Sequence, residues 1–250
     1  MRRRLDALDL EPAADRDAVK DRINLLQRRL AVLQRASREH QLASVVVIEG
    51  WATVGKRAIL HSLVERLDPR GFLVQAGDVD AGLDADGLPW MWPFWQRTPA
   101  RGAFVIYHRS WFAQLLEERL EHGKTTATWS RRCADAVHYE RLLVDDGTLV
   151  TKIFLHLDRA SMRKRLETLR DEPRAEARLA RAERTLSAWK QAFEAVCDGL
   201  ARTEAGCPWH LVGAFDGRLA RLRTLERVAE AIEGGLERRG AQLPDDEEAT

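Results

Sequence analysis

Cysteine, long apolar runs and an N-terminal signal are scarce or missing in this 250-residue sequence, and each absence excludes a class of protein. The three cysteines, Cys133, Cys197 and Cys207, are far apart and lack the spacing of a disulfide framework or a zinc site. No stretch approaches the roughly 20 apolar residues of a membrane span, and no apolar run follows the basic N-terminus as in a secretory signal. We therefore expect a soluble protein of the reducing cytoplasm.

A surplus of charge of one sign is also missing. The sequence carries 40 Lys and Arg residues against 39 Asp and Glu residues, a formal net charge of +1. A protein with this balance has no overall field that would hold it on nucleic acid or on an anionic membrane. Any anion-binding site must therefore be local. The hydrophobic content of 45% is ample for a substantial core, and we expect one large domain.

Short apolar strands alternate with amphipathic helices along the chain. The predicted strands are residues 44–50, 71–80, 102–111, 149–158 and 209–215. The predicted helices are residues 17–40, 57–68, 112–123, 134–147, 161–172, 175–200 and 219–236. This alternation predicts an α/β fold with a mostly parallel sheet that is covered by helices on both faces.

The two ends of the chain differ from this alternating part. Residues 1–44 contain a leading amphipathic helix, because Val19, Ile23 and Leu26 follow a three-to-four spacing on one helical face. The last residues are acidic and have no apolar side chains to bury, so we expect residues 237–250 to form a disordered tail. The α/β domain is then expected over residues 45–236.

The stretch IEGWATVGK has the features of a phosphate-binding loop. Gly50, Gly55 and Lys56 have the spacing G-x-x-x-x-G-K between a β-branched strand and an amphipathic helix. Glycines at both ends let the backbone amides between them, including those of Thr53 and Val54, converge on phosphate oxygens. Lys56 would add a full positive charge. The alternative is an ordinary strand-to-helix turn with an exposed lysine.

Four segments, in order and spacing, resemble the polyphosphate kinase 2 family: IEGWATVGK, WMWPFWQRTPARGAFVIYHRSWF, HYERLLVDDGTLVTKIFLHLD and CPWHLVGAFDGRLARLRTL. The resemblance runs from about Val45 to Leu236. It implies a P-loop kinase-like fold with a helical lid, and magnesium-dependent phosphoryl transfer between inorganic polyphosphate and nucleoside mono- or diphosphates. Polyphosphate and a nucleotide are then the expected partners, without nucleic acid or membrane. A homo-oligomer and a catalytic partner chain both stay open.

Residue by residue, the resemblance implies a set of phosphate-binding groups. Gly50, Gly55 and Lys56 match the family's phosphate loop, and Arg109 matches the arginine of its D-R-S-W motif. Lys56 and Arg109 are the expected catalytic residues. The expected phosphate-binding residues are Gly50, Thr53, Val54, Gly55, Lys56, Arg57, Arg97, Arg101 and Arg109.

Two carboxylates of the family pattern are absent. Ala52 stands where the family loop carries an aspartate, and His108 replaces the aspartate that opens D-R-S-W. The resemblance implies that these carboxylates organise magnesium and the phosphoryl acceptor. Arg57 follows the loop lysine where a hydroxyl would reach the ion. Magnesium is thus a family expectation whose ligands are lost here, and we expect no metal residues in this set.

These losses leave two interpretations open. The first is a polyphosphate:nucleotide phosphotransferase-like protein with impaired catalysis. The second is a non-catalytic module, or pseudoenzyme, that binds polyphosphate or a nucleotide. The segment RSWFAQLLEERLEHG is more similar to the degenerate N-terminal half of the family's tandem fusions than to a catalytic half.

Two further candidates concern the same site. Replacement oxygens for the metal could come from four aspartates that follow the second strand: Asp78, Asp80, Asp84 and Asp86. Such a cluster is more often a solvated turn. His108 could contact phosphate or act as a base, but a neutral imidazole is a poor magnesium ligand.

The remaining candidates have structural interpretations. An aromatic cluster could stack on a nucleobase, but we favour a hydrophobic anchor; its members are Trp90, Trp92, Phe94 and Trp95. Asp145 and Asp146 precede Gly147 and predict a helix-to-strand turn. His156 is interpreted as a buried histidine. The arginine-rich stretch at residues 170–185 is interpreted as a solvated helix rather than a recognition segment.

Overall fold

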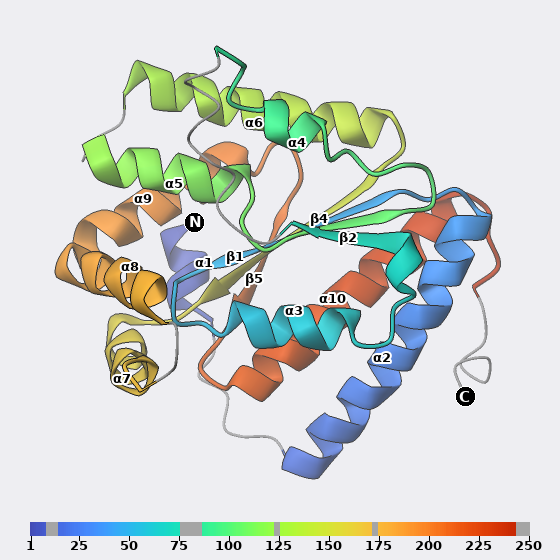
Figure 1. The fold of residues 1–250 in the computed structure, drawn as a ribbon, viewed down its shortest axis with the longest axis horizontal. Helices are drawn as coiled ribbons and strands as arrows, with labels where there is room; N and C mark the ends of the chain where they lie inside the picture. The colour runs from blue at the N-terminus through green and yellow to red at the C-terminus, as the bar shows by residue number, and fades with distance from the viewer. Residues whose placement is uncertain (9–14, 76–86, 123–125, 172–174, 244–250) are drawn as a thin grey trace.

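A single parallel sheet organises the chain. The structure is a computed structural model that describes residues 1–8, 15–75, 87–122, 126–171 and 175–243. Within these ranges five strands have the order β2-β3-β1-β4-β5 (Figure 1). They are β1 (Ser44–Gly50), β2 (Phe72–Gln75), β3 (Phe104–Tyr107), β4 (Leu149–His156) and β5 (Trp209–Gly213). Each of the five predicted strands has a counterpart in this sheet, although β3 is shorter than predicted and residues 76–80 of the second predicted strand lie outside the described residues. The predicted α/β class is confirmed.

Helices cover both faces of the sheet. One face carries α2 (Arg16–Glu39), α3 (Lys56–Val64) and α10 (Gly217–Arg238), which pack on one another (Figure 1). The other face carries α4 (Trp92–Trp95), α5 (Trp111–His122), α6 (Ala127–Asp145) and α9 (Trp189–Thr203). Two further helices, α7 (Arg159–Leu169) and α8 (Glu176–Ser187), pack against each other beside the sheet. The short elements are α1 (Arg2–Asp6) and a 3₁₀ turn at Pro69–Gly71.

The central strand β1 explains why helices pack on both faces of the sheet. Four consecutive β-branched residues of β1, Val45, Val46, Val47 and Ile48, are at most 2% exposed, so both faces of the strand are buried. Such a continuous apolar run is typical of a parallel strand between two helical layers. β1 pairs with β4 along its whole length, from Ser44 opposite Leu149 to Gly50 opposite Leu155. The carboxyl end of β1 is thereby held at the middle of the sheet.

The helical ends depart in detail from the predicted boundaries. The leading helix α2 packs against α10 and α3 and adds its apolar face to the common core. Helix α10 continues to Arg238, and Ala241 is buried, so ordered chain extends past residue 236. Residues 244–250 of the expected acidic tail lie outside the described residues. None of the helices in the described ranges is both long and apolar enough to cross a membrane.

The predicted helix at residues 175–200 is two helices. Ala188, with φ −109° and ψ 35°, ends α8 and precedes α9. Trp189 then stacks on Phe193, with ring centroids 6.0 Å apart, and contacts Trp51 at 5.0 Å. These apolar contacts fix a break that the continuous helical pattern of the sequence did not indicate.

A buried ion pair ties three elements together on the α6 side of the sheet. Lys152 Nζ of β4 donates to Glu140 Oε2 of α6 at 2.7 Å and to the Thr203 carbonyl of α9 at 2.7 Å. Both side chains are 0% exposed. Glu140 also accepts hydrogen bonds from Trp111 Nε1 at 3.0 Å and from the Cys207 amide at 3.0 Å. These hydrogen bonds and the ion pair offset the free-energy cost of burying both charged groups.

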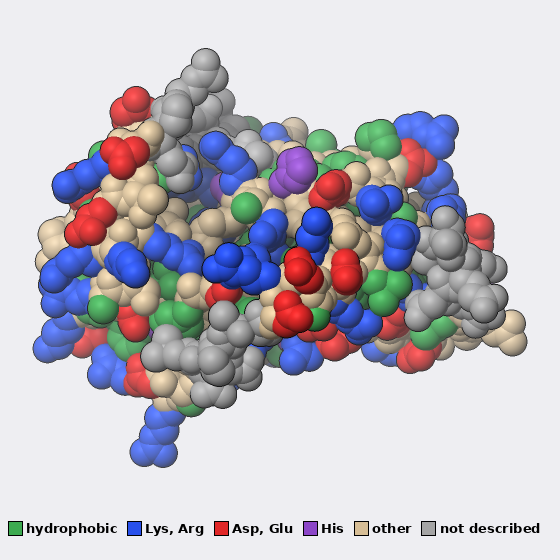
Figure 2. All heavy atoms as spheres, turned by 90° about the horizontal axis from the view of Figure 1, so that it is seen from below, with side chains coloured by type: hydrophobic (Ala, Val, Ile, Leu, Met, Phe, Trp, Pro, Cys, Tyr) green, Lys and Arg blue, Asp and Glu red, His purple; other side chains and the backbone are tan. Residues whose placement is uncertain are grey.

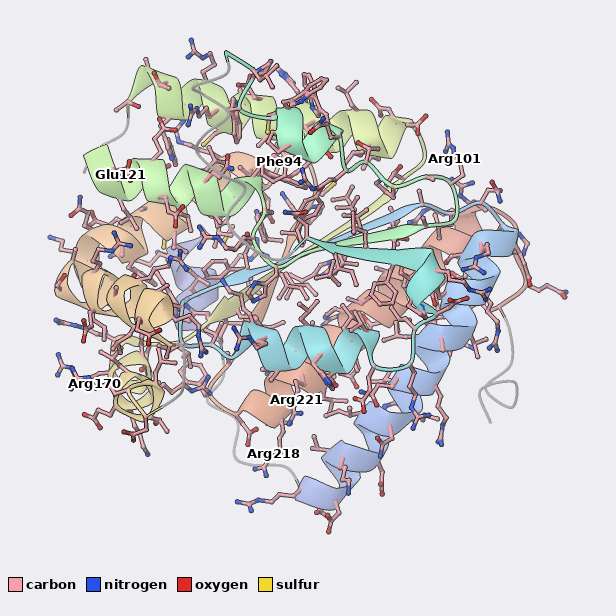
Figure 3. The ribbon with its side chains drawn as sticks, viewed as in Figure 1. Phe94, Arg101, Glu121, Arg170, Arg218 and Arg221 are labelled. Atoms are coloured by element: carbon pink, nitrogen blue, oxygen red, sulfur yellow. The ribbon has the colours of Figure 1, made fainter. Side chains whose placement is uncertain are left out.

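The predicted aromatic anchor lies between α4 and the sheet. Phe94 is 0% exposed and packs on Tyr107 and Trp111, with centroids 5.7 and 5.5 Å away (Figure 3). Its carbonyl accepts a hydrogen bond from Tyr139 Oη at 3.0 Å. The anchor interpretation is therefore confirmed for Phe94, whereas Trp95 of the same cluster is 45% exposed.

Candidate phosphate-binding cavity

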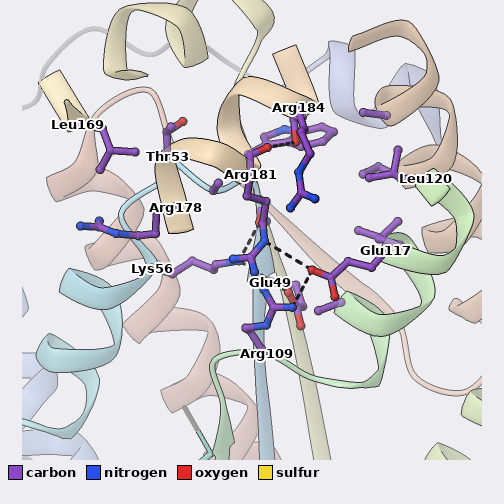
Figure 4. Close-up of a pocket in the computed structure, with 18 of the residues that line it drawn as sticks. Glu49, Thr53, Lys56, Arg109, Glu117, Leu120, Leu169, Arg178, Arg181 and Arg184 are labelled. Atoms are coloured by element: carbon purple, nitrogen blue, oxygen red, sulfur yellow. Dashed lines mark hydrogen bonds and ion pairs between the residues drawn. The ribbon is translucent and has the colours of Figure 1, made fainter. Parts of the chain in front are cut away.

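A cavity of about 860 Å³ opens at the carboxyl ends of β1 and β3. The loop after β1 and the residues that follow β3 form its floor. Its walls come from α5, α7, α8 and α9 (Figure 4). Ligands of open α/β sheets bind at this edge, where strands end and helices begin. The position of the cavity therefore agrees with that of the predicted loop.

The loop backbone requires glycine at both ends. Gly50 has φ +140°, and a Cβ there would collide with the Leu155 carbonyl oxygen of β4. Gly55 has φ +83° and caps the start of α3. Both φ angles lie in a region that glycine adopts readily and that other residues rarely adopt. Trp51 ties the loop to β4, since its Nε1 donates to His156 Nδ1 at 3.2 Å. His156 is 4% exposed, as the buried-histidine interpretation predicted.

Lys56 is held inside the loop. Its Nζ donates to the Gly50 carbonyl at 2.8 Å and lies 3.8 Å from Glu49 Oε2. Glu49, at the end of β1, also accepts hydrogen bonds from the Ser110 amide at 2.7 Å and from Ser110 Oγ at 2.8 Å. Burial lowers the pKa of Lys56, and the Glu49 carboxylate opposes that shift. Burial likewise raises the pKa of Glu49, and Lys56 opposes it. The two groups stabilise each other's charge.

Arg109, which follows β3, is held by a carboxylate of α5. Its Nη2 donates to Glu117 Oε1 of α5 at 2.7 Å, and the same oxygen lies 3.5 Å from Arg181 Nε of α8 (Figure 4). The Arg109 side chain is 14% exposed and that of Glu117 is 43% exposed. Three separate elements of the fold thus meet at one carboxylate oxygen.

Positive charge dominates the cavity although the chain as a whole is almost neutral. The cationic lining residues are Lys56, Arg57, Arg109, Arg165, Arg178, Arg181 and Arg184. The carboxylates that line it are Glu49, Glu117 and Glu121, so cations exceed them by four. On the face formed by α2, α3 and α10, in contrast, basic and acidic side chains are interspersed (Figure 2). The anion-attracting field is therefore local, as the charge balance required.

His108 lies within this cationic group. Burial, together with the nearby positive charges of Lys56, Arg109 and Arg57, lowers the pKa of its imidazole to about 4. The ring is therefore neutral at pH 7. A neutral imidazole can donate to or accept from a phosphate oxygen, but it adds no charge to the site.

Magnesium does not fit the residues that the structure describes here. The ion takes oxygen ligands in near-octahedral geometry. The Glu49 and Glu117 carboxylates are already bonded to Ser110 and to arginines, and the Thr53 hydroxyl, buried without a hydrogen bond, is a single neutral oxygen. Across the described ranges there is no group of three or more His, Cys, Asp or Glu residues that could hold a metal. The four aspartates at 78, 80, 84 and 86 lie outside the described residues.

The structure brings most of the predicted phosphate-binding residues together. Gly50, Thr53, Gly55, Lys56, Arg57 and Arg109 all line the cavity. Val54 does not: it is 1% exposed, and its amide donates to the Trp51 carbonyl at 3.3 Å.

Two predicted arginines lie elsewhere. Arg97 donates to the Pro93 carbonyl at 2.7 Å and does not line the cavity. Arg101 pairs with Asp146 at 2.9 Å, at the end of the sheet opposite to α8 (Figure 3). Asp146 caps the end of α6 before Gly147, as the turn interpretation predicted. The structure therefore gives no support to a phosphate-binding role of these arginines in this cavity.

The arginines of α8 are the residues that sequence reasoning missed. Arg178, Arg181 and Arg184 line the cavity, a position that the interpretation of this stretch as a solvated helix did not include. Their spacing of three places them on one helical face, and this spacing was the available signal. Arg165 of α7 was also missed. It donates to the Thr53 carbonyl at 3.2 Å and to the Phe215 carbonyl at 3.0 Å, and so ties the loop to the segment after β5.

Comparison with known proteins points to one family. The family model of polyphosphate kinase 2 matches residues 13–239. A polyphosphate:AMP phosphotransferase of Pseudomonas aeruginosa is 32% identical over 237 residues, which are 94% of this chain and 47% of that protein. An AMP/ADP-polyphosphate phosphotransferase of Meiothermus ruber is 26% identical and matches 88% of this chain and 83% of that protein. The chain thus spans about half the length of the Pseudomonas aeruginosa relative.

Solved structures agree with this assignment. A polyphosphate kinase 2 crystal structure from Pseudomonas aeruginosa has a TM-score of 0.83 at 32% identity and covers 94% of this chain and 51% of that chain. One from Arthrobacter aurescens has a TM-score of 0.83 at 21% identity, with 96% and 88% covered, and supports the fold. The P-loop kinase-like fold is therefore confirmed. Because the family model spans nearly the whole chain and solved members share its fold, this chain belongs to the polyphosphate kinase 2 family.

Proposed function

We propose that the cavity binds a chain of phosphoryl groups, as inorganic polyphosphate or as the phosphates of a nucleotide. The supporting observation is that Lys56 and Arg109 reach one cavity whose lining has an excess of four cations. The loop amides and the start of α3 add partial positive charge on the same side. At family level this role is that of a polyphosphate:nucleotide phosphotransferase.

Catalysis by this chain is proposed to be impaired. Phosphoryl transfer depends on positioning and on neutralising charge around the transferred group. The two positions where the family pattern has aspartates carry Ala52 and His108, and both residues line the cavity. The lining carboxylates Glu49 and Glu117 are bonded to cations of the protein itself. Phosphate binding is thus better supported than phosphate transfer.

A non-catalytic binding module is the second candidate. The same cation excess favours it, because an anion site needs no metal when seven cationic side chains line it. The two candidates differ in turnover and agree on binding. Binding is therefore the first measurement.

Calorimetric titration with tripolyphosphate and with ATP, each with and without magnesium, tests the proposal. We expect binding to depend little on magnesium and to fall by about ten- to a hundred-fold in Lys56→Ala, since a charge-assisted hydrogen bond contributes about 1.5–3 kcal/mol. Lys20→Ala is the matched control, because Lys20 is an exposed lysine of α2 outside the cavity. Absence of binding by every phosphorylated ligand would refute the proposal, and a large magnesium requirement would refute its metal-independent form.

A further inference from the structure

Glu117 occupies the point where Arg109 and Arg181 converge. Its Oε1 lies 2.7 Å from Arg109 Nη2 and 3.5 Å from Arg181 Nε (Figure 4). Arg109 follows β3, whereas Arg181 belongs to α8 on another wall of the cavity. Two guanidinium groups from unconnected elements therefore share one anionic oxygen.

This arrangement suits a phosphoryl group better than a carboxylate. The planar guanidinium fork binds carboxylate and phosphate oxygens in the same way. A terminal phosphate presents three oxygens and about −1.5 to −2 charges at neutral pH, whereas a carboxylate presents two oxygens and one charge. A phosphate at this position would therefore interact more strongly with both arginines than Glu117 does.

We infer that Arg109 and Arg181 form a second phosphoryl subsite, and that Glu117 is an internal competitor which a phosphate chain displaces. The inference rests on the proposed function, since the first phosphoryl group is placed on the loop with Lys56. Both clusters line the same cavity, so the ligand is a linear multi-phosphate that reaches from the loop to α8. Orthophosphate is too short to use both subsites.

Glu117 can be changed without disturbing the interior. Its side chain is 43% exposed, whereas Glu49, the carboxylate beside Lys56, is 3% exposed and bonded to Ser110. Glu121 provides the matched control. It lies four residues later on α5, lines the same cavity, is exposed, and lies near the outer end of the helix (Figure 3). Glu121→Gln thus removes the same charge without removing the Arg109–Glu117–Arg181 contact.

The test is calorimetric titration of tripolyphosphate at constant ionic strength without magnesium. We expect Glu117→Gln to bind about 3- to 30-fold more tightly than the wild type, the range set by one competing surface ion pair and one unit of charge near the ligand. Glu121→Gln should tighten binding by less than about 3-fold, because it leaves the Arg109–Glu117–Arg181 contact in place. Orthophosphate affinity should change less than tripolyphosphate affinity in Glu117→Gln.

A second arm tests the arginine. In the Glu117→Gln background, Arg181→Met should abolish the gain in tripolyphosphate affinity. Arg170→Met in the same background is the control, because Arg170, the residue that caps the end of α7, pairs with Glu183 outside the cavity lining. It removes the same charge and should leave most of the gain.

The outcomes separate this inference from the proposed function. In the first case, the wild type binds tripolyphosphate and Lys56→Ala weakens that binding, but the affinity of Glu117→Gln is no higher than that of Glu121→Gln. This result refutes the second subsite and leaves the phosphate-binding proposal standing. If neither the wild type nor Glu117→Gln binds, the proposed function fails and the inference fails with it. A gain in tripolyphosphate affinity that occurs only in Glu117→Gln, and that Arg181→Met abolishes, supports both the proposed function and the second subsite.

Discussion

Restoring the two carboxylates of the family pattern is the decisive test of impaired catalysis. The double variant Ala52→Asp/His108→Asp places aspartates at two positions that line the cavity. Burial at position 108 would raise the pKa of an aspartate there, and the charges of Lys56, Arg109 and Arg57 would oppose that shift. The cation excess of the lining would fall from four to two.

The expected magnitude follows from the electrostatics of the transfer. Preorganised groups that stabilise developing charge are typically worth about 10²–10³ in rate each. We expect the double variant to turn over polyphosphate with AMP, ADP, GMP or GDP at least about 10²-fold faster than the wild type in the presence of magnesium. Without magnesium, the same variant should bind tripolyphosphate more weakly, since each added carboxylate repels the ligand by about 1 kcal/mol or more.

The assay is product formation by coupled or chromatographic detection, with the two single variants and Lys56→Ala in the double background as controls. The reasoning is refuted if the double variant is folded and binds tripolyphosphate but shows no rate increase. In that case another feature of the cavity, outside positions 52 and 108, disables the site. Wild-type turnover at about 1–100 per second, the ordinary range of kinases, would refute the impairment itself.

Two further predictions concern stability. Lys152→Met leaves Glu140 buried without its ion partner and should lower the free energy of unfolding in urea by about 3–5 kcal/mol, whereas the double variant Glu140→Leu/Lys152→Met should lose less; equal losses would contradict this account. Burial lowers the pKa of His156 from 6.5 to about 4. The unfolded chain therefore binds a proton that the folded chain does not, and stability should fall by up to about 3 kcal/mol between pH 6.5 and 4. His156→Leu should reduce that slope, and an unchanged slope would show that other groups cause it.

Local patterns in the sequence were sufficient for the framework. The β-branched run at residues 44–50 and the glycine spacing after it predicted β1 and its loop, and the structure has both at these positions. Glycine could be placed because its conformational freedom is a property of the residue itself. Family motifs extended the prediction from β1 and its loop to the whole sheet and to the cavity positions of Lys56 and Arg109.

Only the tertiary structure decided which charges share the site. Arg101 is close to Arg109 in sequence, yet it pairs with Asp146 at the far end of the sheet. Arg181 is far from Arg109 in sequence, yet both contact Glu117. A strand advances about 3.3 Å per residue and carries neighbours in sequence away from each other, while the packing of α8 beside the loop brings distant residues together. Periodicity predicts the face of a helix on which a charge lies, but the direction of that face depends on long-range packing of apolar side chains, which no local pattern contains.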